Sequence, residues 1–420
     1  MSDNSRHDLD HGPIRKCQAC GFDGLELVID LGHQPPCDSL LTPAQLDEAE
    51  NTYPLRFLRC PNCSLAQIDY AVAPEVLFYA DYPYRSGITS TLAHNLRSTG
   101  FKAIEKFLLN PGDLAVDIGS NDGTLLSAFK EKGMRVLGVE PTNIANIANE
   151  NGIPTIQRFF TQEVSRQVRE EHGLASVVTA ANMFAHVEKL GSLISGVESL
   201  LADGGIFITE SHYLLDLLET VQYDSIYHEH LKYYSLKSLI RVFSEYNFTI
   251  TDVDRIENYG GSIRVYAVKG RNLPISETVT RLLAEEERKG LYTSAPFKVF
   301  AERVRKSKFD LQQLLFNAKA NGKTVVGVGC PGRSSTLVNY CGIDVDVMPI
   351  IAEQSSSLKL GLRLPGKHIP IVDEKLMFEE QPDYALILSW HYWRPIVKNL
   401  RAKGLKSKII IPLPDVRVME

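Results

Sequence analysis

Apolar residues along this chain fall into short runs of strand length and longer stretches with helical spacing. Over 91–109 they recur at helical intervals, and Asn110-Pro111-Gly112 ends the predicted helix. Four apolar runs separated by helical segments then follow, a pattern typical of buried parallel strands. These runs are 113–118, 136–140, 176–180 and 205–210. The pattern predicts a doubly wound α/β domain.

The alternation returns in the carboxyl-terminal part of the chain. Further strands are predicted at 253–257 and 262–268, and 277–319 is rich in Leu, Ala, Glu, Lys and Arg, as expected of long helices that bridge two domains. A second α/β unit follows, with predicted strands at 323–329, 347–352, 384–388 and 408–411. The predicted fold class is α/β, with two separate Rossmann-like units.

The amino-terminal segment 17–73 differs from both units. Its short apolar stretches are broken by five prolines, which predicts too little regular structure to build a core unaided. It carries two cysteine pairs, Cys17-x-x-Cys20 and Cys60-x-x-Cys63. Two residues between thiolates let both sulfurs reach one tetrahedral ion, and two pairs complete a closed, structural zinc shell. Cys37, between the pairs, is expected to be a packing residue.

Length and composition set the remaining limits. A chain of 420 residues is too long for one core, and we expect three domains, at 1–75, 76–270 and 271–420. The net charge of -6 offers no general attraction to nucleic acid or anionic membrane. The sequence has neither an apolar run long enough to cross a bilayer nor a secretory signal, so a cytoplasmic protein is expected. Its seven cysteines favour metal ligands over disulfides.

A glycine-containing loop follows the first predicted strand of the central domain and opens a helix. Gly119 and Gly123 allow backbone amides to approach a ligand, and Asn121 tolerates a left-handed conformation. Glu140 ends the next strand, where a carboxylate can accept both hydrogen bonds from a ribose diol. The predicted cofactor site comprises Asp117, Gly119, Ser120, Asn121, Asp122, Gly123, Glu140, Pro141 and Asn182.

Loop spacing favours S-adenosylmethionine over NAD as this cofactor. Three residues separate Gly119 from Gly123, unlike the one-then-two spacing of dinucleotide binders. That dinucleotide spacing occurs later, at Gly327-Val328-Gly329-Cys330-Pro331-Gly332, with Glu353 after the next strand. The second loop therefore binds either NAD or the diphosphate of a nucleotide sugar, in both cases through phosphate. Its predicted substrate residues are Gly329, Cys330, Gly332, Arg333 and Ser334, with hydroxyls also from Ser335 and Thr336.

Titratable groups gather between the two α/β units, at Tyr227-His228-Glu229-His230. A His with a pKa near 6.5 can accept a proton at neutral pH, and an adjacent carboxylate can orient it. His186 follows a strand's carboxyl end, where open sheets place ligands. Each histidine alone is equally consistent with a structural role. A metal site of His228 and His230 is less favoured, because alternate residues on a helix diverge. Upstream, Tyr82 and Tyr84 either contact a sugar or cover a domain joint.

The order of these motifs resembles that of the zinc-containing sugar C-methyltransferases, which act on nucleotide-linked 4-keto-6-deoxy sugars. The resemblance extends from about residue 16 to residue 416. It implies a zinc-binding amino-terminal domain, a central class I S-adenosylmethionine domain and a carboxyl-terminal domain that helps to bind the nucleotide sugar. It also implies that Tyr227, Glu229 and His230 belong to the active site, faced by His186 and by Tyr82 or Tyr84. One departure is Cys330-Pro331-Gly332-Arg333, where the family usually has Ala-Thr-Ala-Lys.

The expected reaction is methylation of C3 of the sugar through an enolate. His230 is the expected base, assisted by Glu229, with Tyr227 or Tyr84 donating to the enolate oxygen and His186 as orienter or alternate base. The expected partner is a dTDP- or GDP-linked sugar, with no nucleic acid or membrane partner and either a monomer or a dimer. The rival predictions are an NAD-dependent oxidoreductase that uses Gly327, Gly329 and Gly332, and a nucleotide-binding protein without catalysis.

Overall fold

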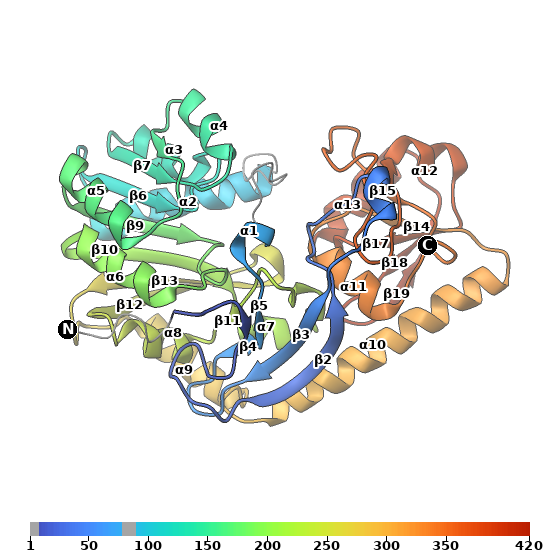
Figure 1. Ribbon diagram of the computed structural model, residues 1–420, viewed down its shortest axis with the longest axis horizontal. Helices are drawn as coiled ribbons and strands as arrows, with labels where there is room; N and C mark the ends of the chain where they lie inside the picture. Colours follow the sequence, from blue (N-terminus) through green and yellow to red (C-terminus); the bar gives the residue numbers. More distant parts are fainter. Residues whose placement is uncertain (1–7, 78–89) are drawn as a thin grey trace.

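The computed structural model describes residues 8–77 and 90–420. Figure 1 shows two α/β regions side by side, with the strands of the amino-terminal region between them at the bottom of the view. The long helix α10 (Ala295–Ala320) runs beneath the carboxyl-terminal region and contacts elements of all three parts, namely β2, α7, α11 and β14. Among the described helices, none is both long and apolar enough to cross a membrane.

The central sheet has seven strands in the order β12-β13-β10-β9-β6-β7-β8. Five are parallel and confirm the predicted doubly wound core: β6 (Leu114–Ile118), β7 (Arg135–Val139), β8 (Thr155–Ile156), β9 (Ala175–Ala181) and β10 (Leu201–His212). Two antiparallel strands, β13 (Ser262–Lys269) and β12 (Phe248–Ile256), extend the sheet beyond β10.

Helices cover both faces of this sheet because its strands are apolar on both sides. Val116 and Val178 pack in one cluster with α5 (Gln162–His172) and α6 (Leu190–Leu200). The preceding residues Ala115 and Val177 pack in another cluster with α2 (Ser90–Phe107) and α3 (Thr124–Glu131). Successive strand residues point to opposite faces, so a continuous apolar run requires two helical layers. The other helices here are α4 (Ile144–Glu150), α7 (Leu214–Glu219) and α8 (Leu236–Phe243).

The carboxyl-terminal sheet has the order β16-β15-β14-β17-β18-β19. Its parallel strands are β14 (Val325–Val328), β15 (Ile351–Glu353), β16 (Ile371–Asp373), β17 (Tyr384–Ile387) and β18 (Lys408–Ile411), and β19 (Arg417–Met419) is antiparallel. The sequence did not predict β16 and β19, since three residues carry too little pattern. The helices are α9 (Glu277–Arg288), which precedes α10, and α11 (Arg333–Cys341), α12 (Glu374–Glu380) and α13 (Trp393–Ala402).

The amino-terminal segment contains more regular structure than its prolines suggested. The strands β2 (Glu26–Gln34), β3 (Tyr53–Arg59) and β4 (Ala66–Ile68) form an antiparallel sheet. Buried and less buried residues alternate along β3, which lets this sheet pack one face against the rest of the molecule. Smaller elements are β1 (Gly12–Pro13), β5 (Tyr70–Ala71) and α1 (Pro74–Leu77).

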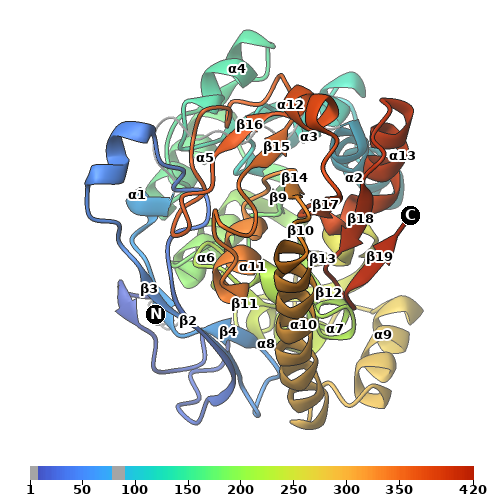
Figure 2. The same ribbon diagram turned by 90° about the vertical axis from the view of Figure 1, so that its right-hand side faces the viewer.

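A strand from the central part of the chain completes this sheet. In β11 (Lys232–Tyr233), Lys232 pairs with Gln67 and Tyr233 with Ala66, and both views show β11 beside β4 (Figures 1 and 2). The segment that follows His230 therefore belongs to the sheet that carries the cysteine pairs. The domain limits drawn from the sequence, 1–75 and 76–270, remain a prediction, and this sheet has strands on both sides of that limit.

Candidate active site

The four paired cysteines converge on one point. Their sulfur atoms lie within 4.8 Å of one another, with Cys17 and Cys63 3.5 Å apart and Cys20 and Cys60 3.6 Å apart. A tetrahedral ion with bonds of about 2.3 Å places sulfurs about 3.8 Å apart, so this donor set fits zinc. All four are buried and none is in a disulfide.

Both cysteine pairs are held in the same type of turn. The amide of Cys17 donates to the carbonyl of Phe22, and the amide of Gly21 donates to the carbonyl of Cys17. Cys60, Ser64 and Leu65 repeat the two bonds, from Cys60 to Leu65 and from Ser64 to Cys60. Gly21 and Ser64 both have positive φ, at 72° and 63°. The matching turns explain why the pairs present their sulfurs alike.

The glycine loop leaves the end of β6 in left-handed conformations. Gly119, Asn121 and Gly123 have φ of 68°, 49° and 79°. The amide of Asn121 donates to Oε2 of Glu140 over 3.0 Å, which ties the loop to the end of the next strand. A Cβ on Gly119 would lie 3.2 Å from Cγ of Met183, so a side chain would crowd this cradle. These features fit the adenosine half of S-adenosylmethionine.

A cavity of about 1040 Å³ opens at the carboxyl ends of β6, β7, β9 and β10. This volume is at the upper end of the range for ligand pockets, about 300–1,000 Å³. Asp122 and Gly123 are not among its lining residues; Gly123 caps α3 instead, and Oδ1 of Asp122 accepts the hydroxyl of Thr124 over 2.6 Å. The predicted cofactor residues that line it are Asp117, Gly119, Ser120, Asn121, Glu140, Pro141 and Asn182.

Asp117 lies beneath the cofactor loop. Burial, and the nearby charge of Glu140, raise the pKa of the Asp117 carboxyl to about 7, although the hydroxyl of Thr179 donates to it over 2.5 Å and works in the opposite direction. A carboxyl held at the floor of a cavity in this way can bind an ammonium or hydroxyl group in either protonation state.

Three histidines meet at the far wall of the cavity. His186 follows β9, His212 ends β10 and His230 precedes β11. The ring centre of His230 lies 4.8 Å from that of His186 and 4.7 Å from that of His212. Burial lowers the pKa of His186 to about 4 and of His212 to about 3, and it lowers the pKa of His230 well below its usual range. The cluster is therefore neutral at physiological pH.

The orientation of His230 leaves one nitrogen basic. Its Nδ1 lies 2.9 Å from the carbonyl of Ser225, and because a carbonyl only accepts, Nδ1 carries the proton. The lone pair is then on Nε2, as a general base requires. The ring of Tyr227 lies 4.1 Å from that of His230, and burial raises the pKa of the Tyr227 hydroxyl well above 10, so the hydroxyl remains a donor.

Glu229 lines the cavity, and its carboxylate contacts Cys37, which the sequence analysis treated as a packing residue. Sγ of Cys37 lies 3.3 Å from Oε1 of Glu229, and burial beside carboxylates raises the pKa of this thiol well above 9. Asp38 lies within the same group of acidic and sulfur ligands. However, Nζ of Lys359 is 3.2 Å from Oδ1 of Asp38, so an ammonium group already balances the negative charge there. We assign no metal to it.

Two predictions from the sequence remain, a metal site at His228 and His230 and a sugar contact by Tyr82 or Tyr84. His228 turns away from His230: its Nε2 lies 3.2 Å from the carbonyl of Pro54, and its ring packs on Tyr53. Within the described ranges, no group of metal-type ligands contains either histidine, so their joint metal site gains no support. Tyr82 and Tyr84 lie outside the described residues, and their predicted role remains a prediction.

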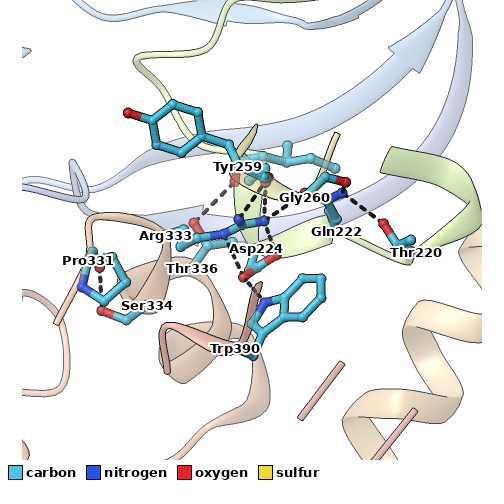
Figure 3. Close-up of polar contacts among 12 residues, drawn as sticks. Thr220, Gln222, Asp224, Tyr259, Gly260, Pro331, Arg333, Ser334, Thr336 and Trp390 are labelled. Carbon is cyan, nitrogen blue, oxygen red and sulfur yellow. Dashed lines mark hydrogen bonds and ion pairs between the residues drawn. The ribbon is translucent and has the colours of Figure 1, made fainter. Parts of the chain in front are cut away.

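The second glycine loop meets the cavity at Gly332 and Arg333. Gly329, Cys330 and Ser334 lie behind this edge: the amide of Cys330 donates to Oε2 of Glu353 over 2.8 Å, and the hydroxyl of Ser334 donates to the carbonyl of Pro331. The Arg333 guanidinium contacts Asp224, Gln222 and Ser225 of the central region (Figure 3). The loop predicted to hold phosphate thus opens toward the same cavity as the first loop.

Two further residues at the site were not predicted. His212 ends a parallel strand, and the carboxyl-end rule that identified His186 would have identified it as well. Tyr259 lines the cavity with a φ of 53°, and its ring lies 5.7 Å from that of His212. Its sequence offers only a weak signal, the Gly260-Gly261 pair that follows it.

Comparisons with known proteins identify the family of this chain. Profiles of three families match successive segments: a zinc binding domain over 17–78, a methyltransferase domain over 92–253 and a C-methyltransferase C-terminal domain over 257–414. The chain is 34% identical over 411 residues to the C-methyltransferase NovU of Streptomyces niveus, a match that covers 97% of each chain.

Solved structures resemble only part of the chain. The magnesium protoporphyrin IX methyltransferase of Synechocystis PCC 6803 with bound S-adenosylmethionine is 14% identical, with 42% of this chain and 79% of that one covered and a TM-score of 0.33. The CurJ carbon methyltransferase is 17% identical, with 47% and 61% covered and a TM-score of 0.35. At these scores the likenesses carry nothing about function.

Proposed function

Because the chain belongs to the family of C-methyltransferases with an amino-terminal zinc-binding domain, we propose that it methylates C3 of a nucleotide-linked 4-keto-6-deoxy sugar. Its activity as an S-adenosylmethionine-dependent C-methyltransferase follows from the family. The sugar, the position and the mechanism are the proposal. The product would serve the biosynthesis of a branched-chain deoxysugar.

The observation that carries the proposal is a single cavity shared by the cofactor loop and a neutral histidine cluster. Carbon is a poor nucleophile until a neighbouring proton is removed, so carbon methylation needs a base next to the methyl donor. A ketone at C4 acidifies the hydrogen on C3, and a neutral imidazole can remove it. When bound, S-adenosylmethionine supplies an electrophilic methyl group on a positively charged sulfur.

The residues divide this chemistry between them. Nε2 of His230 takes the C3 proton while the electron pair of the C–H bond moves into the enolate. The Tyr227 hydroxyl donates toward the enolate oxygen as charge develops. Glu229, the adjacent residue, is assigned to assist the base, and the ring centre of His186 lies 4.8 Å from that of His230, which suits an orienter or alternate base. With S-adenosylmethionine held at the Gly119 loop, C3 would accept the methyl group, and sulfur would keep the electron pair of the broken carbon–sulfur bond.

The carboxyl-terminal loop is the proposed contact for the nucleotide. Gly332 and Arg333 border the cavity, and Gly329, Cys330 and Ser334 form the turn behind them. This placement would let a diphosphate lie along the loop while the sugar reaches the histidines. Both dTDP- and GDP-linked sugars fit this description.

Hydrogen exchange at C3 tests the proposal without methyl transfer. Incubation of a dTDP-4-keto-6-deoxy sugar with the enzyme in D₂O, without the methyl donor, is expected to give deuterium at C3. His230→Asn is expected to lose about 100-fold or more in exchange rate, as for removal of a general base. His228→Asn, whose ring points away from the cavity, is the matched control and is expected to retain exchange.

Two results would contradict this function. Full exchange and methylation by His230→Asn would remove that residue as the base. Calorimetric binding of NAD, without binding of S-adenosylmethionine, would instead favour the oxidoreductase alternative at the Gly327-Gly329-Gly332 loop.

A further inference from the structure

A buried ion pair between the two α/β regions forms part of the cavity wall. Arg333 begins α11 of the carboxyl-terminal region, and Asp224 lies in the short helix η4 (Tyr223–Ser225) of the central region. Only 6% of the Arg333 side chain and none of the Asp224 side chain is exposed. Burying both charges is costly unless their geometry is good and further hydrogen bonds satisfy the remaining donors and acceptors.

The Nε and Nη2 groups of the Arg333 guanidinium are well hydrogen-bonded, and Nη1 is not. Nε of Arg333 donates to Oδ2 of Asp224 over 2.9 Å, and Nη2 donates to Oδ1 over 3.0 Å (Figure 3). Nη2 also contacts Gln222 and Ser225, and Nε1 of Trp390 donates to Oδ2 of Asp224 over 2.7 Å. The guanidinium and its carboxylate are therefore fixed in place.

The Nη1 group of Arg333 has more N–H donors than hydrogen-bond acceptors near it. It carries two of the five guanidinium N–H groups, and its contact in the described part of the chain is the carbonyl of Tyr259, 3.5 Å away. One Nη1–H consequently has no acceptor among the described residues. Arg333 and Tyr259 both line the cavity, whereas Asp224 does not.

The two charges of the Arg333–Asp224 pair shift the pKa values of different neighbours, at the cavity and beside α11. The positive charge of Arg333 lowers the pKa of His212, at the cavity, after the larger effect of burial. The negative charge of Asp224 raises the pKa of Tyr223 and Cys341, on the side of α11, again after burial. The positive end of the pair thus faces the cavity. The charge of Arg333 also lowers the pKa of His230, after burial and the two neighbouring histidines.

We propose that Nη1 of Arg333, oriented by Asp224, is a catalytic hydrogen-bond donor to the enolate oxygen at C4 of the sugar. The assignment rests on the proposed function. As the C3–H bond breaks and its proton passes to His230, the electron pair spreads onto the C4 oxygen, where a fixed guanidinium N–H stabilises it. The carboxyl-terminal region then contributes to the chemistry as well as to nucleotide binding.

The test separates this role from diphosphate binding. Arg333→Met is expected to lose about 100-fold in C3 exchange, as for removal of an oxyanion donor, with KM for the dTDP-4-keto-6-deoxy sugar and affinity for S-adenosylmethionine nearly unchanged. Arg333→Lys retains the charge but not the forked geometry, and its exchange is expected to fall less, with KM again unchanged. A rise in KM alone in either variant would assign Arg333 to the diphosphate and overturn the proposal.

A second buried pair provides the matched control. Arg264 and Glu210 are equally buried, at 0% and 1%, but neither lines the cavity. Arg264→Lys is expected to retain exchange, and parallel losses in Arg264→Lys and Arg333→Lys would indicate a merely structural role. If Arg333→Met fails to bind S-adenosylmethionine, the C3 exchange rate and the KM of Arg333→Lys are the test of the assignment. Wild-type enzyme that exchanges no 4-keto sugar would refute the proposed function and this assignment with it, whereas active wild type with unaffected variants would refute the assignment alone.

Discussion

Two glutamates occupy equivalent places in the parallel parts of the two large sheets. Glu140 follows β7 and accepts the amide of Asn121, and Glu353 ends β15 and accepts the amide of Cys330. Each therefore ties a glycine loop to the neighbouring strand. Only Glu140 lines the described cavity, so the same local arrangement has different access to a ligand.

This difference predicts an asymmetric effect on cofactor binding. Glu140→Gln is expected to weaken the binding of S-adenosylmethionine by about 10- to 100-fold, since hydrogen bonds to a charged group contribute about 1.5–3 kcal/mol. Glu353→Gln should leave that affinity unchanged. Isothermal titration calorimetry on both variants checks this, and equal losses would show that the first loop is not the cofactor site.

Neutral burial of His212 predicts a pH-dependent stability. An unfolded histidine titrates near 6.5, whereas burial lowers the pKa of His212 in the fold to about 3. Between these values the unfolded chain binds more protons, so the free energy of unfolding falls as the pH falls. From pH 7 to pH 5 the loss for this residue is about 2 kcal/mol. Denaturant unfolding of His212→Asn should show a correspondingly smaller loss than wild type; an identical pH dependence would contradict the burial of a neutral ring.

At the scale of elements, helix α8 depends on a residue from α9. The carboxylate of Glu286 accepts the amides of Leu236 and Lys237 in the first turn of α8. It also accepts the hydroxyls of Tyr213 and Tyr292. Glu286 has no exposed surface, so four donors satisfy a fully buried carboxylate that also faces the positive end of the α8 dipole.

Removal of this carboxylate should destabilise the fold. Glu286→Ala is expected to lower the free energy of unfolding by about 2–4 kcal/mol, because it leaves buried donors without an acceptor. The neighbouring Glu285 pairs with Arg255 nearer the surface, and Glu285→Ala should cost about 1 kcal/mol or less. Chemical denaturation of both variants compares them. Similar small losses would indicate that water replaces the Glu286 carboxylate.

At the scale of the whole molecule, the zinc-binding part is connected to the catalytic segment. Strand β4 follows the second cysteine pair and pairs with β11, two residues after His230. Cys37, from the loop that follows β2, reaches Glu229. The cysteine pairs are distant from the chemistry in sequence, yet the region that carries them contacts Glu229 through Cys37 and pairs with the strand that follows His230.

Loss of the metal should therefore affect catalysis more than cofactor binding. Cys60→Ser is expected to lose zinc, to melt at a lower temperature and to lose methylation by at least an order of magnitude, while it retains affinity for S-adenosylmethionine. Cys341→Ser, at a buried cysteine outside the cluster, should retain its zinc. Metal content, thermal unfolding and calorimetry measure these effects, and a zinc-free variant with full methylation would contradict the connection.

The sequence predicted those features whose residues lie close together along the chain. The longer parallel strands and the zinc cysteines were predicted, because their patterns lie within short segments. The amino-terminal sheet was underestimated, because its fourth strand comes from residues 232–233. The predicted site residues that are described fall around one cavity or just behind it, but the site roles themselves await experiment.

The sequence by itself determined the longer elements of the two α/β regions, the cysteine quartet and the two glycine loops, since each follows from residue types at fixed local spacing. Only the tertiary structure brought Arg333 to Asp224, Cys37 to Glu229 and His212 to His230, over separations of 109, 192 and 18 residues. Such contacts depend on how whole sheets and helices pack, which no local spacing encodes. The physical reason is that a reaction site needs groups from several elements, and packing alone decides which of them meet.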